Sequence, residues 1–308
     1  MSFPAVRRAL PALAASAASA ALTACAAVVT LSLALYAGTA SAGAAEQFRI
    51  APELDQGFRA LGTHGVFVLY DEQAQRWTVS DARRAYQAFR PASTYKIPNT
   101  LIALEAGVAQ DETQVFKWDG QKRWNEDWNQ DQTLQTAFRF SAVWVHQEIA
   151  RKVGAEGLQS RLWAWRYGNA VAGPRHDSYW LDGDLRITAV QQVEFLRRFA
   201  EHRLPISERT ETVARRVFLR EETPGWRLFA KTGWDGSGPV ELGWFVGWTE
   251  RRNGTGRCFF ALNMDMQVDP KSLPAGSKPP SQHELIRQLG PHRERLARQT
   301  LQAQGCLD

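Results

Sequence analysis

Cysteine is scarce in this sequence, with 3 among 308 residues, and neither a CxxC nor an HExxH pattern occurs. Metal sites built on those spacings are therefore not expected. Runs of lysine and arginine interleaved with aromatic residues are also missing, which argues against a nucleic-acid partner. The net charge of +5 is mild and concerns solubility rather than a partner.

Charge is nearly absent from the first 45 residues, where only Arg7 and Arg8 are charged. A basic start followed by a small and apolar stretch is typical of a secretory signal. The Ala-Ser-Ala sequence at 40–42 offers a cleavage site. Residues 1–42 are therefore predicted to be a signal peptide and residues 43–308 a periplasmic domain.

Two alternatives to cleavage at 40–42 stay open. Leu22–Cys25 resembles a lipoprotein box, and the apolar run 26–37 is a candidate membrane anchor. Cleavage is preferred, because apolar sequence continues past Cys25 and then ends in a small-residue site. No stable membrane partner is expected after it.

Two cysteines remain in the predicted mature chain, Cys258 and Cys306. Cys258 stands in an apolar run and is interpreted as a small buried hydrophobic residue. A disulfide between the two is compatible with export, but their spacing does not determine it.

The order of predicted elements is strands, then helices, then strands. β-branched and aromatic residues predict strands in a hairpin over 65–80 and over 226–234, 242–249 and 257–264. Apolar periodicity predicts helices over 52–61, 93–106, 141–154, 158–165, 188–200 and 282–301, with residues 110–135 irregular.

This order predicts an α+β fold, in which helices flank a central antiparallel β-sheet. The sheet part is expected to comprise about residues 47–90 and 205–308, and an all-helical part, about residues 91–204, is inserted between them.

A serine and a lysine stand three residues apart at the start of a predicted helix, as Ser93 and Lys96. Residues at i and i+3 share a helix face, so the hydroxyl and the amine can touch. A nucleophile beside a base is what covalent catalysis requires. By themselves the two residues also fit a helix-capping serine and a solvated lysine.

Two further pieces follow in order, Ser141–Val143 and Lys231–Gly233. Together with Ser93–Lys96 they resemble the catalytic set of the penicillin-recognising serine enzymes. The resemblance to the class D β-lactamases, the oxacillinases, is closer and runs from about residue 65 to residue 273. Four other segments carry it as well: Val115–Gly120, Tyr167–Asn169, the Trp180-Leu181 loop and the Gly243–Trp248 strand.

The resemblance implies that Ser93 attacks the lactam carbonyl and that Lys96 provides the base. Lys96 is implied to be an N6-carboxylysine, formed when the neutral amine takes up carbon dioxide or bicarbonate. Val143 and Trp180 are implied to surround this group, and the Trp180 indole NH to orient it. No glutamate suited to activating the hydrolytic water is found, so the same base is implied for acylation and deacylation.

The resemblance also implies roles for the other pieces. Ser141 relays a proton to the leaving nitrogen, and Lys231 supplies positive charge near Ser141 and the substrate carboxylate. Thr232 and Gly233 bind the substrate from the strand edge. The amide of the nucleophile and that of Trp234 form the oxyanion hole.

One position departs from the family pattern. Class D enzymes commonly carry an arginine soon after a Leu-Pro pair, where it holds the substrate carboxylate. Here the pair at 273–274 is followed by Ala-Gly-Ser and then Lys278. Either Lys278 takes the place of the arginine as a point charge, or no cation occupies this position. The sequence therefore does not predict which β-lactams are accepted.

The expected activity is hydrolysis of β-lactam antibiotics through a serine acyl-enzyme, without a separate cofactor, by a monomer or homodimer. Two other classes share the motifs: a cell-wall D,D-peptidase, which deacylates slowly, and a β-lactam sensor domain, which stays acylated. The Trp180 loop and the compact length argue against the peptidase. The single N-terminal apolar segment argues against the sensor, because sensor domains are parts of proteins with several membrane-spanning segments.

Overall fold

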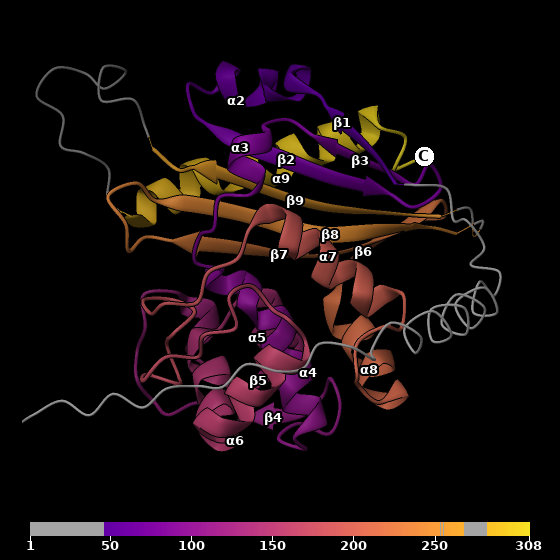
Figure 1. Cartoon of the computed structure of the whole chain (residues 1–308). Helices are drawn as coiled ribbons and strands as arrows, with labels where there is room; N and C mark the ends of the chain where they lie inside the picture. Colours follow the sequence, from indigo (N-terminus) through magenta and orange to yellow (C-terminus); the bar gives the residue numbers. More distant parts are fainter. Residues whose placement is uncertain (1–45, 253, 255, 268–281) are drawn as a thin grey trace, which may run out of the picture. The chain divides into compact units, whose positions relative to one another are not determined.

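The structure is a computed structural model that describes residues 46–252, 254, 256–267 and 282–308 (Figure 1). Residues Glu46–Asp308 form one compact unit. The predicted signal peptide and both alternatives to it lie outside the described residues. Within the described ranges, no helix is both long enough and apolar enough to span a membrane.

Seven strands form one mixed sheet in the order β1-β3-β2-β9-β8-β7-β6 (Figure 1). All neighbours pair antiparallel except β1 and β3, which are parallel. The strands are β1 (Gln47–Ile50), β2 (Gly65–Asp71), β3 (Arg76–Val79), β6 (Leu219–Glu222), β7 (Trp226–Asp235), β8 (Leu242–Arg251) and β9 (Arg257–Asp265). The α+β class and the predicted strands are confirmed, whereas β1 and β6 were not predicted.

Alternate residues of the strand β2 face two different hydrophobic cores. Val66 and Val68 contribute to the core shared with the inserted helices, whereas Phe67 and Leu69 contribute to the core under the last helix. Successive side chains of a strand point to opposite faces, so a strand covered on both faces is apolar throughout. This explains why the central strand β2 is apolar over nearly its whole length.

Helices cover both faces of the sheet (Figure 1). The larger core is shared with α4 (Lys96–Glu105), α5 (Leu134–Phe140), α6 (Val143–Ala164), α7 (Ala189–Ala200) and α8 (Glu208–Phe218). The other core is covered by α2 (Gln56–Ala60) and α9 (Gln282–Ala303). The short elements are η1 (Pro52–Asp55), α3 (Ala82–Ala85), η2 (Ala92–Tyr95), η3 (Glu126–Trp128), and the paired strands β4 (Val115–Phe116) and β5 (Gln132–Thr133).

Most predicted helices are confirmed, with changes at their ends. The helix at 188–200 is α7, which begins at a capping box formed by Thr188 and Gln191. The two helices predicted on either side of Gly154 are halves of α6, which is interrupted where Gly154 has a φ of 78°. The helix predicted from Ser93 begins instead as the 3-10 turn η2 and becomes α-helical at Lys96.

Three α-helices, α3, α5 and α8, were not predicted. Residues 110–135 are also more ordered than expected, because β4, η3 and β5 lie within them. The helix α5 is only 7 residues long, too short for a clear apolar period. It begins at a capping box formed by Thr133 and Thr136. The helix α8 begins after Ser207, whose side chain accepts a hydrogen bond from the Thr210 amide.

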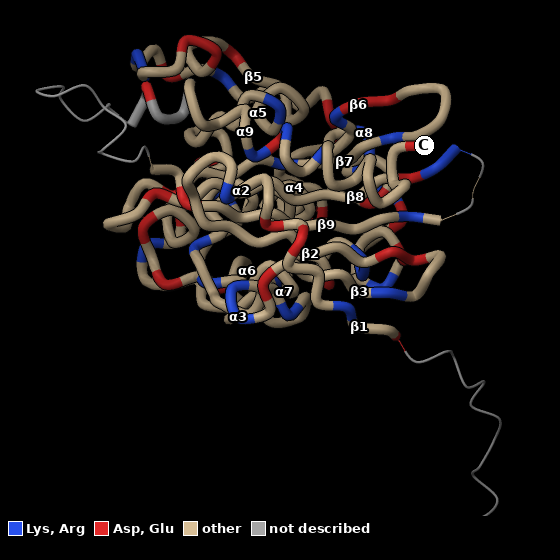
Figure 2. The backbone as a smooth tube through the Cα atoms, turned by 90° about the horizontal axis from the view of Figure 1, so that it is seen from above, with Lys and Arg blue, Asp and Glu red and all other residues tan. Residues whose placement is uncertain are grey.

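Basic and acidic residues are interspersed along the backbone (Figure 2). Several pair across elements that are distant in sequence. Arg257 Nε on β9 donates to Glu72 Oε2 at 2.9 Å, and Arg216 on α8 reaches Glu112 with Nε at 2.6 Å. These ion pairs join loops to the helices and strands that they cover.

Cys258 and Cys306 form a disulfide, with their Cα atoms 5.9 Å apart. The disulfide that the sequence left open is therefore present, and the Cys258 side chain is buried as expected. The bond joins β9 to the segment that follows α9. Both cysteines belong to the core covered by α2 and α9, and the disulfide cross-links it.

Removing the disulfide with the double substitution Cys258→Ala and Cys306→Ala is expected to lower the free energy of unfolding by about 4 kcal/mol. A bond closing a loop of 48 residues restricts the unfolded chain by roughly this amount. Denaturant titration with and without reductant measures the effect. Reductant should destabilise the wild type and leave the variant unchanged; equal stability of the two oxidised proteins would contradict the prediction.

Candidate active site

The pair Ser93 and Lys96 is held at the junction of η2 and α4. Lys96 Nζ lies 2.9 Å from Ser93 Oγ, within hydrogen-bond distance. The residue before the serine, Ala92, has a φ of 46°, a left-handed conformation that costs free energy outside glycine. Its amide donates to the Trp180 carbonyl at 3.0 Å, which ties the serine turn to the Trp180 loop.

Lys96 is completely buried. Burial lowers the pKa of its amine from 10.5 to about 7, because the ammonium form loses its hydration. Tyr95, the residue before Lys96, is also buried and stacks on the buried Trp180 with ring centroids 4.9 Å apart. A substantial share of Lys96 is therefore an uncharged amine at neutral pH, in contact with the serine hydroxyl.

Ser141 ends α5 in a left-handed conformation with a φ of 61°. Its Oγ is buried and has no hydrogen-bond partner among the described residues. The same holds for the indole nitrogen Nε1 of Trp180. Buried polar atoms without partners are uncommon in folded proteins, so these two indicate a site prepared for a polar group.

The strand β7 runs beside η2 and carries Lys231–Trp234. A Cβ atom on Gly233 would lie 3.0 Å from Thr94 Cγ2 and 3.1 Å from the Pro91 carbonyl oxygen. Glycine at this position lets the strand approach the serine turn closely.

Lys231 is buried, and its Nζ donates to the carbonyl oxygen of Thr232 at 3.0 Å. Burial, and then the charge of Lys96, lower the pKa of Lys231 well below its usual value. The two lysines are thus electrostatically coupled.

A pocket of about 280 Å³ opens beside the serine. It brings together Ser93, Ser141 and Val143 with the β7 residues Thr232, Gly233 and Trp234. Its remaining walls are mainly aromatic or apolar, with Trp124, Asn125, Trp128, Phe140, Leu181 and Arg293. Of the predicted site residues, Lys96, Lys231 and Trp180 lie outside this lining and are buried.

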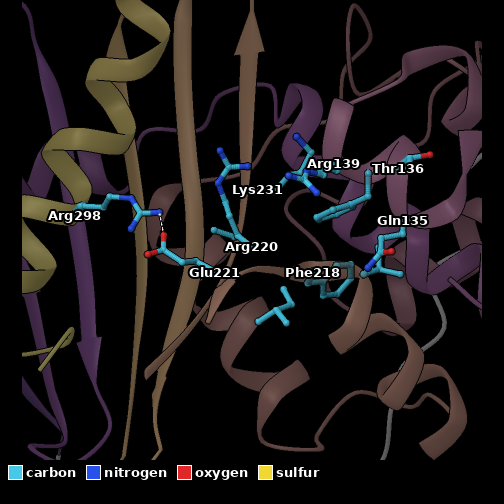
Figure 3. A pocket seen from close by; sticks show the side chains of 12 residues that line it. Gln135, Thr136, Arg139, Phe218, Arg220, Glu221, Lys231 and Arg298 are labelled. Carbon is cyan, nitrogen blue, oxygen red and sulfur yellow. Dashed lines mark hydrogen bonds and ion pairs between the residues drawn. The ribbon is translucent and has the colours of Figure 1, made fainter. Parts of the chain in front are cut away.

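Lys231 instead lines a second pocket, of about 440 Å³, between α5, α8 and the strands β6 and β7 (Figure 3). Arg220 and Arg298 also line it, and each is neutralised by a glutamate: Arg298 Nη2 donates to Glu221 Oε2 at 2.6 Å, and Arg220 pairs with Glu294. Neither Ser93 nor Ser141 reaches this pocket.

Arg293 on α9 is a site residue that was not predicted. Its Nη1 donates to the Gly233 carbonyl at 2.9 Å, and its guanidinium carbon lies 5.5 Å from the Trp234 ring centroid. Burial lowers its pKa to about 10, so it is still cationic at neutral pH. The cation at the serine pocket was expected at Lys278, which lies outside the described residues.

A signal for Arg293 existed in the sequence. It precedes Ala297 and Leu301 at intervals of four residues, and both are completely buried. An arginine on the apolar face of an amphipathic helix is rarely buried without a partner. That pattern predicts a buried cation on the inner face of α9.

Tyr167 and Asn169 support the site without lining the pocket. Asn169 Nδ2 donates to the Asp184 carbonyl at 2.8 Å, and its Oδ1 accepts from the Arg186 amide at 3.0 Å. Tyr167 packs edge-on against Tyr95 at 5.9 Å. These contacts fix the loop that carries Trp180.

Within the described ranges, no group of three or more histidine, cysteine, aspartate or glutamate side chains has a geometry that could hold a metal ion. The serine pocket contains no carboxylate side chain either. Among the described residues, the group in contact with Ser93 Oγ that could act as a base is the buried amine of Lys96.

Comparisons with known proteins identify a matching family and several similar proteins. The family described as penicillin binding protein transpeptidase domain matches residues 65–277. Beta-lactamase OXA-48 of Klebsiella pneumoniae is 42% identical over 226 residues, 73% of this chain and 83% of that protein. Beta-lactamase OXA-5 of Pseudomonas aeruginosa is 43% identical over 217 residues, 70% of this chain and 80% of that protein.

Solved structures share the fold. The class D β-lactamase YbXI from Nostoc matches with a TM-score of 0.73 and 36% identity, covering 82% of this chain and 99% of that one. A class D β-lactamase from Sebaldella termitidis matches with a TM-score of 0.76 and 29% identity, covering 86% of this chain and 100% of that one. Every residue lining the serine pocket except Arg293 falls inside the matched family region.

Proposed function

This chain belongs to the class D β-lactamases, and we propose that it hydrolyses β-lactam antibiotics through an acyl-enzyme formed on Ser93. The observation that carries the proposal is the 2.9 Å contact between Ser93 Oγ and the buried Lys96 Nζ. A hydroxyl becomes a competent nucleophile when an adjacent base removes its proton. Among the described residues, the amine of Lys96 is the group that contacts Ser93 Oγ in this way.

Acylation forms a bond from Ser93 Oγ to the lactam carbonyl carbon and opens the ring at its C–N bond. Ser93 is the second residue of the 3-10 turn η2, where its amide has no acceptor within the helix. We assign this amide and that of Trp234 as the oxyanion donors. Trp234 follows Gly233 on β7, the strand that passes closest to the turn.

The base is proposed to be a carboxylate on Lys96, an N6-carboxylysine formed with carbon dioxide or bicarbonate. The chain's own residues fit this group. The amine has a pKa of about 7, and the buried donors Trp180 Nε1 and Ser141 Oγ have no partner within the described ranges. When bound, it supplies an oxygen base for both acylation and deacylation. Trp180 Nε1 would hold it, and Val143 would help to exclude water.

Ser141 and Lys231 are proposed to handle the proton that the leaving nitrogen requires. Ser141 lines the pocket beside Ser93, and its Oγ has no competing partner among the described residues. Lys231 is electrostatically coupled to Lys96 and buried behind the pocket. A charge placed there stabilises negative charge as it develops in the transition state.

The substrate carboxylate is proposed to bind Arg293 and Thr232. Both line the serine pocket, and Arg293 is the one cationic side chain among the described residues that does. Its guanidinium is anchored through Nη1 to Gly233, while its buried Nε has no hydrogen-bond partner in the described part of the chain. A planar guanidinium suits a carboxylate better than the point charge expected from Lys278.

Replacing Arg293 with glutamine is therefore expected to lower kcat/KM for penicillins about 10- to 100-fold, mainly through KM. A hydrogen bond to a charged group contributes roughly this much free energy. Steady-state kinetics on a penicillin measures it. The control is Arg295→Gln, which changes an exposed arginine on the same helix. Unchanged kinetics for Arg293→Gln would place the carboxylate elsewhere.

Export to the periplasm is proposed as well. The buried disulfide fits an oxidising compartment, where such bonds persist. The predicted signal peptide would direct the chain there. N-terminal sequencing of the protein recovered from the periplasm tests both the location and the cleavage site at 40–42.

Turnover tests the proposed function against the sensor domain and the D,D-peptidase. Purified mature protein, supplied with bicarbonate, is mixed with an excess of a chromogenic cephalosporin. Hydrolysis is expected to continue for many equivalents per enzyme. A single stoichiometric burst followed by arrest would instead assign the chain to the classes that stay acylated.

A further inference from the structure

A histidine is buried where α4 and α6 pack together. His146 on α6 and Asn99 on α4 are both completely buried. Asn99 Oδ1 lies 2.8 Å from His146 Nδ1, and Asn99 Nδ2 donates to the His146 carbonyl at 3.4 Å. Because the amide oxygen only accepts, Nδ1 carries the ring hydrogen and Nε2 carries the lone pair.

These residues stand next to the active site on both helices. His146 is three residues after Val143, and Asn99 is three residues after Lys96, so each shares a helix face with a site residue. His146 Nε2 is buried and has no hydrogen-bond partner among the described residues. A buried nitrogen without a partner costs free energy that an apolar ring would avoid.

The charges acting on the ring come from the two site lysines. Burial first, and then the ammonium forms of Lys96 on α4 and Lys231 on β7, hold the pKa of His146 well below its usual value. No carboxylate of the described residues acts on the ring. The burial and the positive lysines both favour the neutral form of His146. If Lys96 carries a negative charge instead, its effect reverses and the pKa of His146 rises.

We propose that His146 is a positioning residue that takes up a proton when Lys96 is carboxylated, and that the resulting imidazolium retains the carboxylate at acidic pH. Carboxylation joins Lys96 Nζ to the carbon of carbon dioxide and breaks one N–H bond, which releases one proton. At acidic pH the His146 Nε2 lone pair accepts a proton. Because binding is reciprocal, the carboxylate on Lys96 raises the affinity of the ring for its proton, and the ring proton raises the affinity of Lys96 for carbon dioxide to the same extent. This inference rests on the proposed carboxylation.

The test compares the mature wild type with His146→Phe and His146→Gln, neither of which can be protonated at this position. Each protein is titrated with ¹³C-bicarbonate, and the carbamate carbon signal is followed by NMR from about pH 6 to about pH 8.5, which spans the usual histidine range. The matched control is His202→Gln, because His202 also contacts an acceptor, Glu211 at 2.7 Å, but its side chain is 76% exposed.

At about pH 8.5 all four proteins should require similar bicarbonate for half occupancy, because the ring is neutral. At about pH 6 the two His146 variants should require roughly tenfold more than the wild type, which corresponds to one pKa unit. The His146 ring signals of the wild type should also titrate at higher pH with bicarbonate than without it. His202→Gln should follow the wild type throughout.

Three results overturn the inference. Equal bicarbonate requirements at both pH values mean that the ring does not couple to the carboxylate. If both His146 variants require more bicarbonate than the wild type by the same factor at every pH, His146 is a packing residue only. Absence of any carbamate signal in the wild type removes the proposed carboxylation itself, and this outcome is distinct from the other two.

Discussion

Replacing Ser93 with alanine is expected to lower kcat for β-lactam hydrolysis by about five to six orders of magnitude, the loss seen when a covalent nucleophile is removed. Ser93 Oγ is the hydroxyl in contact with Lys96, and no other residue of the pocket combines a hydroxyl with a contact to that lysine. Initial rates on a chromogenic cephalosporin, measured with bicarbonate present, give the ratio.

The matched control for the nucleophile is Ser160→Ala. Ser160 lies on α6, is exposed, and its Oγ donates only to the Gly157 carbonyl at 3.2 Å. This variant should keep the wild-type rate. A loss of only about tenfold in rate for Ser93→Ala is no more than the loss of one hydrogen bond would cause. That result would show that another residue is the nucleophile.

Replacing Lys96 with methionine is expected to lower kcat by about three to four orders of magnitude, the upper range for loss of a general base. The same variant should be more stable than the wild type in buffer free of bicarbonate. Lys96 is completely buried, and its ammonium form loses hydration on folding. Methionine has a similar length and carries no charge, so it removes that cost.

The stability difference has a defined pH dependence. Burial lowers the Lys96 pKa from 10.5 to about 7 in the folded protein. Between these values the unfolded chain binds a proton that the folded protein does not, so wild-type stability rises with pH. Below about pH 7 the lysine is charged in both states and the full cost is present. The advantage of Lys96→Met, a few kcal/mol, should therefore be greatest there and vanish toward pH 10.5.

Lys117→Met controls for the loss of a lysine as such, because the Lys117 side chain is 81% exposed and its Nζ lies 2.7 Å from Asp131. It should change neither activity nor stability appreciably. Denaturant titrations in degassed buffer at several pH values provide the measurement. A Lys96→Met protein that lost stability along with activity would show that the lysine is structural.

The parts of the fold that were predictable are those fixed by local patterns. Strands covered on both faces, such as β2 and β9, give unbroken apolar runs, and the capping box at Thr188 marks the start of α7. The contact between Ser93 and Lys96 was also local, because a spacing of three residues on a helical turn fixes it. Such features depend on few neighbours in the sequence.

The parts that were not predictable depend on residues brought together by folding. Arg293 reaches Gly233 across 60 positions, and the disulfide joins residues 48 positions apart. Neither distance is encoded in a period or a turn. The spacing of Arg293 with Ala297 and Leu301 indicated burial, but only the packed structure identifies the carbonyl and the pocket that it faces.

The measurement that tests the acyl-enzyme most directly is mass mapping of the protein quenched with acid during turnover of a slowly hydrolysed β-lactam. The proposed reaction opens the ring without losing an atom, so the peptide containing Ser93 should gain the full mass of the substrate. The adduct should disappear once the substrate is exhausted. Turnover without any adduct on this peptide, or an adduct that forms elsewhere and persists in Ser93→Ala, would contradict the assignment.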